Sequence, residues 1–266
     1  MLVEIRGAGD IATGIALRLH GAGCQVVMCD IAAPTSIRRT VCFSEAIRLG
    51  ACEVEGVRAR LAQTVAEARQ ILAAGDVAVL VDPDAASVAE LEPEVLVDAI
   101  LAKRNLGTTA DMAPVVIGVG PGFTAGSDCD AVVETKRGHY LGRVIYEGAA
   151  APNTGIPGEI AGHSADRVLR APADGTFEPH LSIGDRVHAG EVAAVVSGIP
   201  MTCTIDGVLR GLLPEGTRVS AGMKSGDIDP RCERAHCFSA SDKARAVGGG
   251  VLEALLSLTG ALAGDE

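Results

Sequence analysis

Aromatic residues are scarce in this chain, and tryptophan is absent from it. Aromatic side chains make up 2% of the 266 residues, whereas hydrophobic residues as a whole make up 48%. We therefore expect a sizeable core that is almost entirely aliphatic. Surfaces that bind single-stranded nucleic acid stack its bases on aromatic side chains, so this composition argues against such a surface.

Positive charge is also in deficit. The 23 Lys and Arg residues are outnumbered by 34 Asp and Glu residues, which gives a net charge of -11 at pH 7. A chain of this charge is a poor match for the phosphates of nucleic acids and for anionic membrane surfaces. We therefore expect neither nucleic acid nor a membrane among its partners.

The eight cysteines contain no C-x-x-C pair, and no signal-peptide pattern occurs at the start of the chain. Several cysteines lie in strand-like apolar runs, where a thiol packs as a small hydrophobe. Cys232, His236 and Cys237 form a loose cluster, but zinc usually takes four ligands and no second Cys/His pair lies nearby. We predict reduced thiols, a cytoplasmic location and no metal site. The apolar stretch at 251–263 is short and contains Glu253, so we expect a packed helix there rather than a membrane span.

The most informative pattern is a glycine turn in the run EIRGAGDIATG, residues 4–14. A short strand leads into Gly7 and Gly9, and a helical pattern follows at once. Glycines here allow a tight turn and the close approach of a pyrophosphate to the helix N-terminus. The next strand ends in Asp30, about twenty residues later, where a dinucleotide-binding fold places a ribose-binding carboxylate. Asp10 adds a negative charge that would repel a pyrophosphate, cap the helix or hold a metal; the alternative is a turn that merely needs glycine.

Strand and helix patterns alternate through the first half of the chain. We expect strands at 2–6, 25–29, 77–81 and 94–97, a helix at about 64–74, and a hairpin formed by 131–135 and 141–146.

A second pattern is an internal repeat with an offset of 32 residues. Asp174–Gly175 recurs as Asp206–Gly207, within eight identities in one ungapped register. Two such halves resemble the barrel-sandwich hybrid fold of lipoyl and biotinyl carrier domains. Those carriers display a lysine on the hairpin between the halves, and the corresponding region here, 196–203, has none. A carrier role is therefore not expected.

The predicted fold class is α/β, a Rossmann-like domain with a smaller all-β barrel-sandwich hybrid (biotinyl/lipoyl-like) domain. Residues 1–147 are expected to form the Rossmann-like nucleotide-binding domain, and 148–165 a linker or functional loop. Residues 166–231 would form the hybrid domain, and 232–266 a C-terminal helix that packs on the first domain.

Candidate ligand-binding residues come from two glycine turns and three cations. Arg38 and Arg39 follow the second strand and would grip a phosphate bidentately or form surface ion pairs. Lys103 lies in a charged cluster before a hydroxyl-rich turn, and the glycine-rich turn at 118–126 offers backbone N–H groups to an anion. No Ser-His-Asp signature, H-E-x-x-H or Walker A motif occurs, so no catalytic residue is assigned. The predicted cofactor-binding residues are Gly7, Gly9, Asp10, Ile11, Asp30, Arg38, Arg39, Lys103, Gly120 and Gly122.

Five runs of the sequence together resemble a bacterial family. They are RGAGDIATGIALRLHGAG, PTSIRRTVCFSEA, LAKRNLGTTADMAPVVIGVGPGFTAGSDCDAVVETKRGHYLGRVIYEG, PNTGIPGEI and KSGDIDPR. Its members are accessory proteins of selenium-dependent molybdenum hydroxylase systems, and a more distant similarity is to xanthine dehydrogenase accessory proteins. The resemblance implies a role in maturation or cofactor supply of molybdenum hydroxylases, with such a hydroxylase as partner.

The leading hypothesis is thus an accessory protein that binds a nucleotide-bearing ligand between the two glycine turns. The molybdenum dinucleotide cofactor and NAD(P) are the candidate ligands. Arg38, Arg39 and Lys103 would neutralise phosphates, and Asp30 would bind ribose. Two alternatives are an NAD(P)-dependent oxidoreductase of a small substrate and a non-catalytic docking module for a molybdenum hydroxylase. Whether the chain is an enzyme, and whether it forms a homo-oligomer, is left open.

Overall fold

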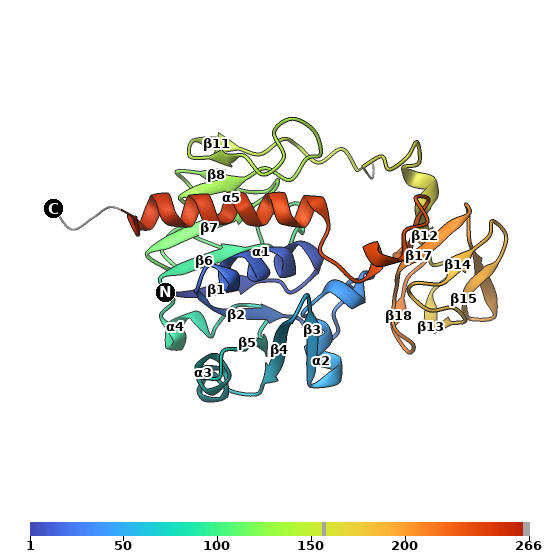
Figure 1. The fold of residues 1–266 in the computed structure, drawn as a ribbon, viewed down its shortest axis with the longest axis horizontal. Coiled ribbons are helices and arrows are strands. Elements are labelled where there is room, and N and C mark those ends of the chain that lie inside the picture. Colours follow the sequence, from blue (N-terminus) through green and yellow to red (C-terminus); the bar gives the residue numbers. More distant parts are fainter. Residues whose placement is uncertain (156–157, 263–266) are drawn as a thin grey trace. The chain divides into compact units, whose positions relative to one another are not determined.

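The computed structural model describes residues 1–155 and 158–262, which divide into two compact units (Figure 1). Unit 1 comprises Met1–Pro34, Cys42–Asn153 and Ala240–Glu266, and unit 2 comprises Thr35–Val41 and Thr154–Ser239. The chain therefore enters unit 2 twice. From the sequence we expected the second domain to be bounded by the segment 148–165 and by residue 232. In the structure, residues 35–41 and 232–239 also belong to unit 2.

Unit 1 is built on a nine-stranded sheet with the order β10-β9-β7-β6-β1-β2-β5-β4-β3. The seven strands from β9 to β4 are mutually parallel, and β10 and β3 are antiparallel edge strands. The central strands are buried along nearly their whole length because helices and loops cover the sheet. The strands are β1 (Leu2–Arg6), β2 (Gln25–Asp30), β3 (Ala51–Val54), β4 (Val57–Ala62), β5 (Val77–Val81), β6 (Val95–Asp98), β7 (Val115–Val119), β9 (Ala131–Val133) and β10 (Val144–Ile145). A separate pair joins β8 (Thr124–Ala125) to β11 (Gly148–Ala149).

Two long helices, α1 (Asp10–Gly21) and α5 (Asp242–Thr259), pack closely alongside each other (Figure 1). Their separation is set by glycine, because a Cβ atom on Gly14 would lie 2.5 Å from the Cβ of Ala244. The start of α5 is capped by Ser241, whose hydroxyl accepts from the Ala244 amide. On α3 (Val65–Ala73), Thr64 accepts in the same way from Glu67, and the helix packs on β2, β4 and β5. The remaining short helices are α2 (Glu45–Leu49), α4 (Val88–Leu91), η1 (Arg39–Val41), η2 (Ala165–Arg167) and η3 (Arg234–Cys237).

Unit 1 departs from the expected Rossmann-like domain in its later crossovers. That fold has a helix in each connection between parallel strands. Residues 99–114, between β6 and β7, contain no helix, and neither do residues 120–130, between β7 and β9. Instead α5, from the far end of the chain, packs against β7, β9 and β10. The strand–turn–helix–strand pattern at 2–30 is local and carries no information on what covers the later strands, so unit 1 is a mixed α/β unit with a large sheet.

Unit 2 contains two four-stranded antiparallel sheets, ordered β12-β19-β17-β14 and β16-β15-β13-β18. The 32-residue repeat is visible in the structure, because β13, β14 and β15 recur as β17, β18 and β19. Unit 2 is larger than the repeat, however. The strand β12 precedes the repeat, and Ile37, from the segment Thr35–Val41, lies in the core of the unit. The strands are β12 (Val168–Arg170), β13 (Gly175–Pro179), β14 (Arg186–Val187), β15 (Val192–Val196), β16 (Ile199–Thr202), β17 (Gly207–Leu212), β18 (Arg218–Val219) and β19 (Lys224–Asp229).

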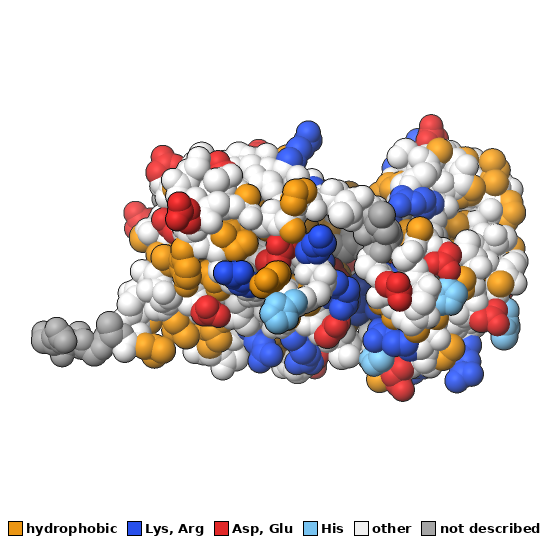
Figure 2. Space-filling view, turned by 90° about the horizontal axis from the view of Figure 1, so that it is seen from above, with side chains coloured by type: hydrophobic (Ala, Val, Ile, Leu, Met, Phe, Trp, Pro, Cys, Tyr) orange, Lys and Arg blue, Asp and Glu red, His pale blue; other side chains and the backbone are white. Residues whose placement is uncertain are grey.

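The surface carries charged side chains of both signs (Figure 2), as the amino-acid composition leads us to expect. On the face displayed in Figure 2, acidic, basic and hydrophobic side chains are interspersed over the described residues. Among the helices of the described ranges, none has the length and apolarity needed to cross a bilayer.

Candidate functional site

The carboxyl ends of the parallel strands of unit 1 form one edge of the sheet, which we call the carboxyl edge. It consists of the loops that follow β1, β2, β5, β6 and β7. The chain proceeds from β1 to β2 and β5 on one side and from β6 to β7 and β9 on the other, so the connectivity reverses between β1 and β6. In open sheets of this kind, ligands bind outside the carboxyl ends beside the point of reversal. Of the predicted ligand-binding residues, Gly7, Gly9, Lys103, Gly120 and Gly122 lie in these loops, and Asp10, Ile11 and Asp30 lie in the adjoining α1 and β2.

The first glycine turn brings the loops of β1 and β6 into contact. Gly7 has φ +98°, and its amide donates to the carbonyl of Cys29 at 2.7 Å. A Cβ atom on Gly7 would lie 2.9 Å from the carbonyl oxygen of Ala99, so glycine is required here for both conformation and space. Gly9 then caps α1 without a side-chain hydrogen bond. Backbone N–H groups of a first helical turn lack partners within the helix, and this end carries the positive pole of the helix dipole.

Asp30 holds this turn closed from the end of β2. Its carboxylate accepts from the amides of Ala8 and Ile31, both at 2.8 Å. Burial raises the pKa of Asp30, and the two amide hydrogen bonds act in the opposite direction. On its other side the turn is covered by the segment before α2, where the amide of Ser44 donates to the carbonyl of Ala8. Asp30 is therefore part of the architecture of the turn.

The loop after β6 connects the first glycine turn to the second. Residues 99 and 100 contact Gly7, and a Cβ atom on Gly122 would lie 2.6 Å from the Cα of Arg104. Between them, Leu101 and Lys103 have φ values of +60° and +65°. Non-glycine residues in this left-handed region cost about 1–3 kcal/mol each, and such strain concentrates at functional sites. The structure thus brings Gly7, Gly9, Lys103, Gly120 and Gly122 to one edge.

A buried polar cluster beneath this edge was only partly identified from the sequence. Arg6 donates to Thr108 and lies 3.4 Å from Asp98, and Thr108 donates to Asp98 at 2.6 Å. The other terminal nitrogen of Arg6 donates to the carbonyls of Pro83 at 3.2 Å and Leu106 at 3.5 Å. Arg6 therefore ties the loop after β5 to the loop after β6.

Glu4 is the second buried charge of β1, two residues before Arg6 and on the same face. Its carboxyl accepts from the Ser87 hydroxyl at 2.8 Å. Burial raises the pKa of Glu4 to about 7, helped by the charge of Asp82 and opposed by the Ser87 hydrogen bond and the Arg6 charge. The sequence signal was available in the strand LVEIR, where two charged residues alternate with apolar ones in a central strand. Charges in such a position must be paired or protonated.

Exposed apolar side chains also gather at the carboxyl edge. Ile31, Val81 and Leu106 are each more than 40% exposed. The parallel register pairs Asp30 with Val81, which places Ile31 beside the end of β5, and Arg6 links Leu106 to Pro83. Three apolar side chains thus flank the buried polar cluster.

Arg38 and Arg39 belong to unit 2. Arg38 donates to the carbonyl of His236 at 3.1 Å, and Arg39 donates to the carbonyl of Leu212 at 2.8 Å. The sequence grouped both arginines with the glycine turns because they follow β2 closely. It could not show that the chain crosses into unit 2 at Thr35.

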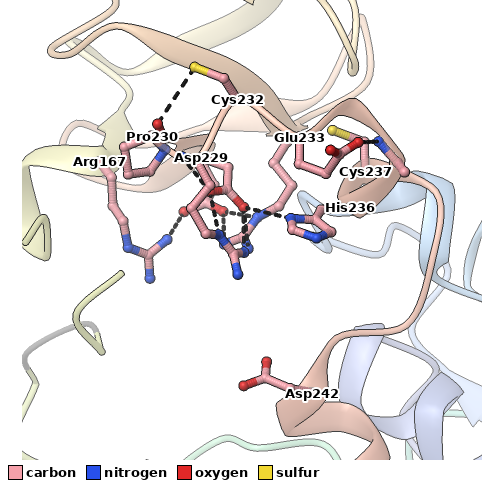
Figure 3. Close-up of polar contacts among 12 residues, drawn as sticks. Arg167, Asp229, Pro230, Cys232, Glu233, His236, Cys237 and Asp242 are labelled. Atoms are coloured by element: carbon pink, nitrogen blue, oxygen red, sulfur yellow. Dashed lines mark hydrogen bonds and ion pairs between the residues drawn. The ribbon is translucent and has the colours of Figure 1, made fainter. Parts of the chain in front are cut away.

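Unit 2 holds a buried network of charges around β17 and β19 (Figure 3). Arg210 donates to Asp227 at 2.8 Å and to Asp229 at 3.2 Å; Arg167 also binds Asp227, and Arg231 binds Asp229. Burial alone would raise the pKa of Asp229, but the hydrogen bonds and charges of Arg231 and Arg210 lower it to about 2. The network joins η2, the two central strands and the segment that follows them.

The cysteines and histidine next to this network are not gathered into a ligand set. Cys232 is exposed, with φ +58°, and its sulfur lies near the carbonyl of Pro230, whereas Cys237 is buried near the carbonyl of Leu209. Across residues 1–155 and 158–262, no group of three His, Cys, Asp or Glu side chains is arranged to hold a metal ion. Burial raises the pKa of Cys52, Cys129 and Cys203 to about 11, so these thiols stay protonated at neutral pH.

Comparisons with known proteins place the chain beside one relative of unknown role. No family model matches the sequence. It is 55% identical over 257 residues to "Uncharacterized protein YqeB" of Escherichia coli (strain K12), which covers 97% of this chain and 48% of that protein. The chain thus spans about half the length of the curated relative it matches.

Two solved structures are similar to parts of the chain. One, described as a succinylglutamate desuccinylase/aspartoacylase from Rhodobacter sphaeroides, is 26% identical, with a TM-score of 0.23, over 25% of this chain and 22% of that one. The other, an aspartoacylase family protein from Mesorhizobium loti, is 14% identical, with a TM-score of 0.26, over 85% and 83%. At these TM-scores neither structure supports an activity for this chain.

The comparisons correct several expectations. The solved structures found are described as desuccinylase and aspartoacylase proteins, and the relative carries no link to molybdenum hydroxylases. The family resemblance, the selenium and molybdenum assignments and the accessory function are therefore wrong, and with that function its two alternatives are also dropped. The expected Rossmann-like domain with a barrel-sandwich hybrid is replaced by a mixed α/β fold with large sheets.

Proposed function

We propose that unit 1 binds a small organic anion with an apolar portion at its carboxyl edge. The observation that carries this proposal is that both glycine turns contact the loop after β6, beside the point where the sheet reverses its connectivity. They are joined by the strained loop 99–104. Parallel sheets bind ligands at this location, and strained loops are retained where they serve a site.

The anionic group has two sources of attraction. The N-terminus of α1 begins at Gly9 without a capping side chain, and helix N-termini attract anions through their N–H groups and dipole. Lys103 and Arg104 add two cations in the loop that contacts both glycine turns. Asp10 and Asp30 oppose an anion at the turn itself. We therefore assign the anionic group to the side of the edge that Lys103 occupies.

The apolar portion would contact Ile31, Val81 and Leu106. A ligand that covers such side chains removes apolar surface from water, which contributes roughly 25 cal/mol for each Å² that is buried. Arg6 acts as a positioning residue here, because its guanidinium holds the loops after β5 and β6 together. The cytoplasmic location predicted from the thiols is kept as part of this proposal.

Calorimetric titration with three probes tests the proposal. Phenyl phosphate carries both features, inorganic phosphate only the anionic group, and phenol only the apolar one. We expect phenyl phosphate to bind more tightly than either of the others. Lys103→Asn removes the charge while asparagine tolerates the left-handed backbone, so the affinity for phenyl phosphate should fall roughly threefold to tenfold.

The matched control is Arg58→Gln, which removes an exposed cation from β4 and should leave the affinity unchanged. Val81→Ser should weaken phenyl phosphate and leave inorganic phosphate unaffected. Equal affinities of the native chain and Lys103→Asn for phenyl phosphate would rule out the anionic assignment.

A further inference from the structure

The segment 136–146, KRGHYLGRVIY, connects β9 to β10 and continues beyond it, and its composition differs from that of the rest of the chain. It contains both tyrosines of the protein, three of its Lys and Arg residues, one histidine and no acid, in a chain with a net charge of -11. A hairpin that only has to be soluble needs no tyrosine. We define the tyrosine surface as Lys136, Arg137, His139, Tyr140, Arg143 and Tyr146.

Its two aromatic rings are turned toward solvent. Tyr140 is 59% exposed and Tyr146 is 46% exposed, whereas three of the four phenylalanines are buried and only Phe238 is exposed. The ring of Tyr140 meets His139 edge to face, with centroids 4.9 Å apart, and the guanidinium carbon of Arg143 lies 5.3 Å from its centroid. Tyrosine and arginine are among the residues enriched at the energetic centres of protein interfaces.

The loop that carries this surface packs against α5. Arg137 binds Asp242 bidentately at 2.6 and 2.8 Å, at the start of that helix. A Cβ atom on Gly142 would lie 2.6 Å from the carbonyl oxygen of Ala246, and Gly142 also donates to the carbonyl of Glu134 at 2.9 Å. A surface that is already ordered loses little conformational freedom on binding, which favours association.

We infer that the tyrosine surface docks an acidic segment of a partner protein. Carboxylates of the segment would face Lys136 and Arg143, and its apolar side chains would pack on the tyrosine rings. Strand addition is not the mode, because β10 is only two residues long and offers little backbone to pair. Nucleic acid fits less well, since the chain as a whole repels it. This inference is independent of the ligand site proposed at the carboxyl edge.

Selective labelling gives a direct test, because the chain has two tyrosines. The full chain is labelled with ¹³C-tyrosine, and the two ring signals are assigned with Tyr140→Phe and Tyr146→Phe. It is titrated with a ten-residue peptide of glutamate and leucine, with the same peptide carrying lysine for glutamate, and with a ten-nucleotide DNA strand. We expect saturable shifts of both rings with the acidic peptide only. Arg143→Gln should weaken that binding roughly fivefold or more, and Arg58→Gln should not change it.

Three results would overturn the inference. The first is no shift with the acidic peptide, or an equal affinity in Arg143→Gln. The second is a stronger response to DNA than to the peptide. The third is a shift that depends on the concentration of the chain alone, which would identify a second copy as the occupant.

Discussion

At the scale of single residues, the buried carboxyl of Glu4 is the group whose behaviour the structure specifies most sharply. It lies in a central strand, fully removed from solvent, and one of its oxygens accepts from Ser87. Since burial raises the pKa of Glu4 from its ordinary value of 4.5 to about 7, the folded chain holds a proton that the unfolded chain releases. Between these values the folded state binds more protons, so the free energy of unfolding falls as the pH rises.

Replacing Glu4 by glutamine should therefore stabilise the chain at high pH. The native chain should lose up to about 3 kcal/mol of unfolding free energy between pH 4.5 and 8, and Glu4→Gln should not. Urea denaturation at pH 4.5, 6 and 8 measures this difference. Glu53→Gln, at an exposed position of β3, is the control and should follow the native chain. The contradicting result is a difference in unfolding free energy between the native chain and Glu4→Gln that is the same at pH 4.5 and at pH 8. It would show that Glu4 is ionised in both the folded and the unfolded chain.

At the scale of secondary-structure elements, the contact between α1 and α5 determines how unit 1 closes. Gly14 faces Ala244, and a Cβ atom on Gly248 would lie 2.8 Å from the carbonyl oxygen of Gly14. The two backbones therefore approach without side chains between them. This contact joins residues that are more than 200 positions apart in the sequence, and it takes the place of a crossover helix beside β7 and β9.

Gly14→Ala should destabilise the chain by about 1–3 kcal/mol, because the added methyl group overlaps Ala244 in a packed contact. Gly249→Ala lies in α5, where an added Cβ meets no atom within 4 Å among the described residues, and is the matched control. It should stabilise the chain by about 0.4–1 kcal/mol, because alanine favours the helix and restricts the unfolded chain. Differential scanning calorimetry of both variants checks the pair, and equal shifts in the same direction would contradict the close approach.

Secondary-structure elements that local sequence patterns specify were predicted correctly, and arrangements that depend on distant contacts were not. The helix expected at 64–74 and the hairpin at 131–146 are confirmed as α3 and as β9 with β10, because local periodicity and turn residues specify them. The repeat located the strands of unit 2 for the same reason. The C-terminal helix was expected to pack on the first domain, and α5 does so; its particular partners, α1 and the strands β7, β9 and β10, and the passage of 35–41 into unit 2 were not predictable, because they depend on contacts between distant segments.

The residues of the candidate site show the same difference between what local patterns predict and what depends on distant contacts. The glycine turns and Lys103 were found from their local patterns, and the structure brings them to one edge. Arg38 and Arg39 were assigned to that edge on sequence proximity and lie in unit 2. The role of Asp30 in closing the turn, and the cluster of Arg6 with Asp98 and Thr108, depend on which strands become neighbours. Charged residues at alternate positions of β1 were the available signal for the cluster.

At the scale of the whole molecule, the chain combines two units with different chemistry. Unit 1 presents glycine turns, a strained loop and exposed apolar side chains at one edge of its sheet. Unit 2 has Arg167, Arg210 and Arg231 joined to Asp227 and Asp229 in a network that links its strands. This contrast is why we place the ligand site in unit 1. The relative at 55% identity is about twice as long as this chain, so its full activity is a question for the longer protein.

The most direct test of the ligand site is to map where phenyl phosphate binds on the ¹⁵N-labelled chain. The account predicts that amide signals of residues 8–12, 101–104, 120 and 122–124 shift together and saturate at one ligand concentration, and that Lys103→Asn weakens all three groups equally. Shifts confined to unit 2, or shifts at the glycine turns that survive Lys103→Asn unchanged, would contradict it.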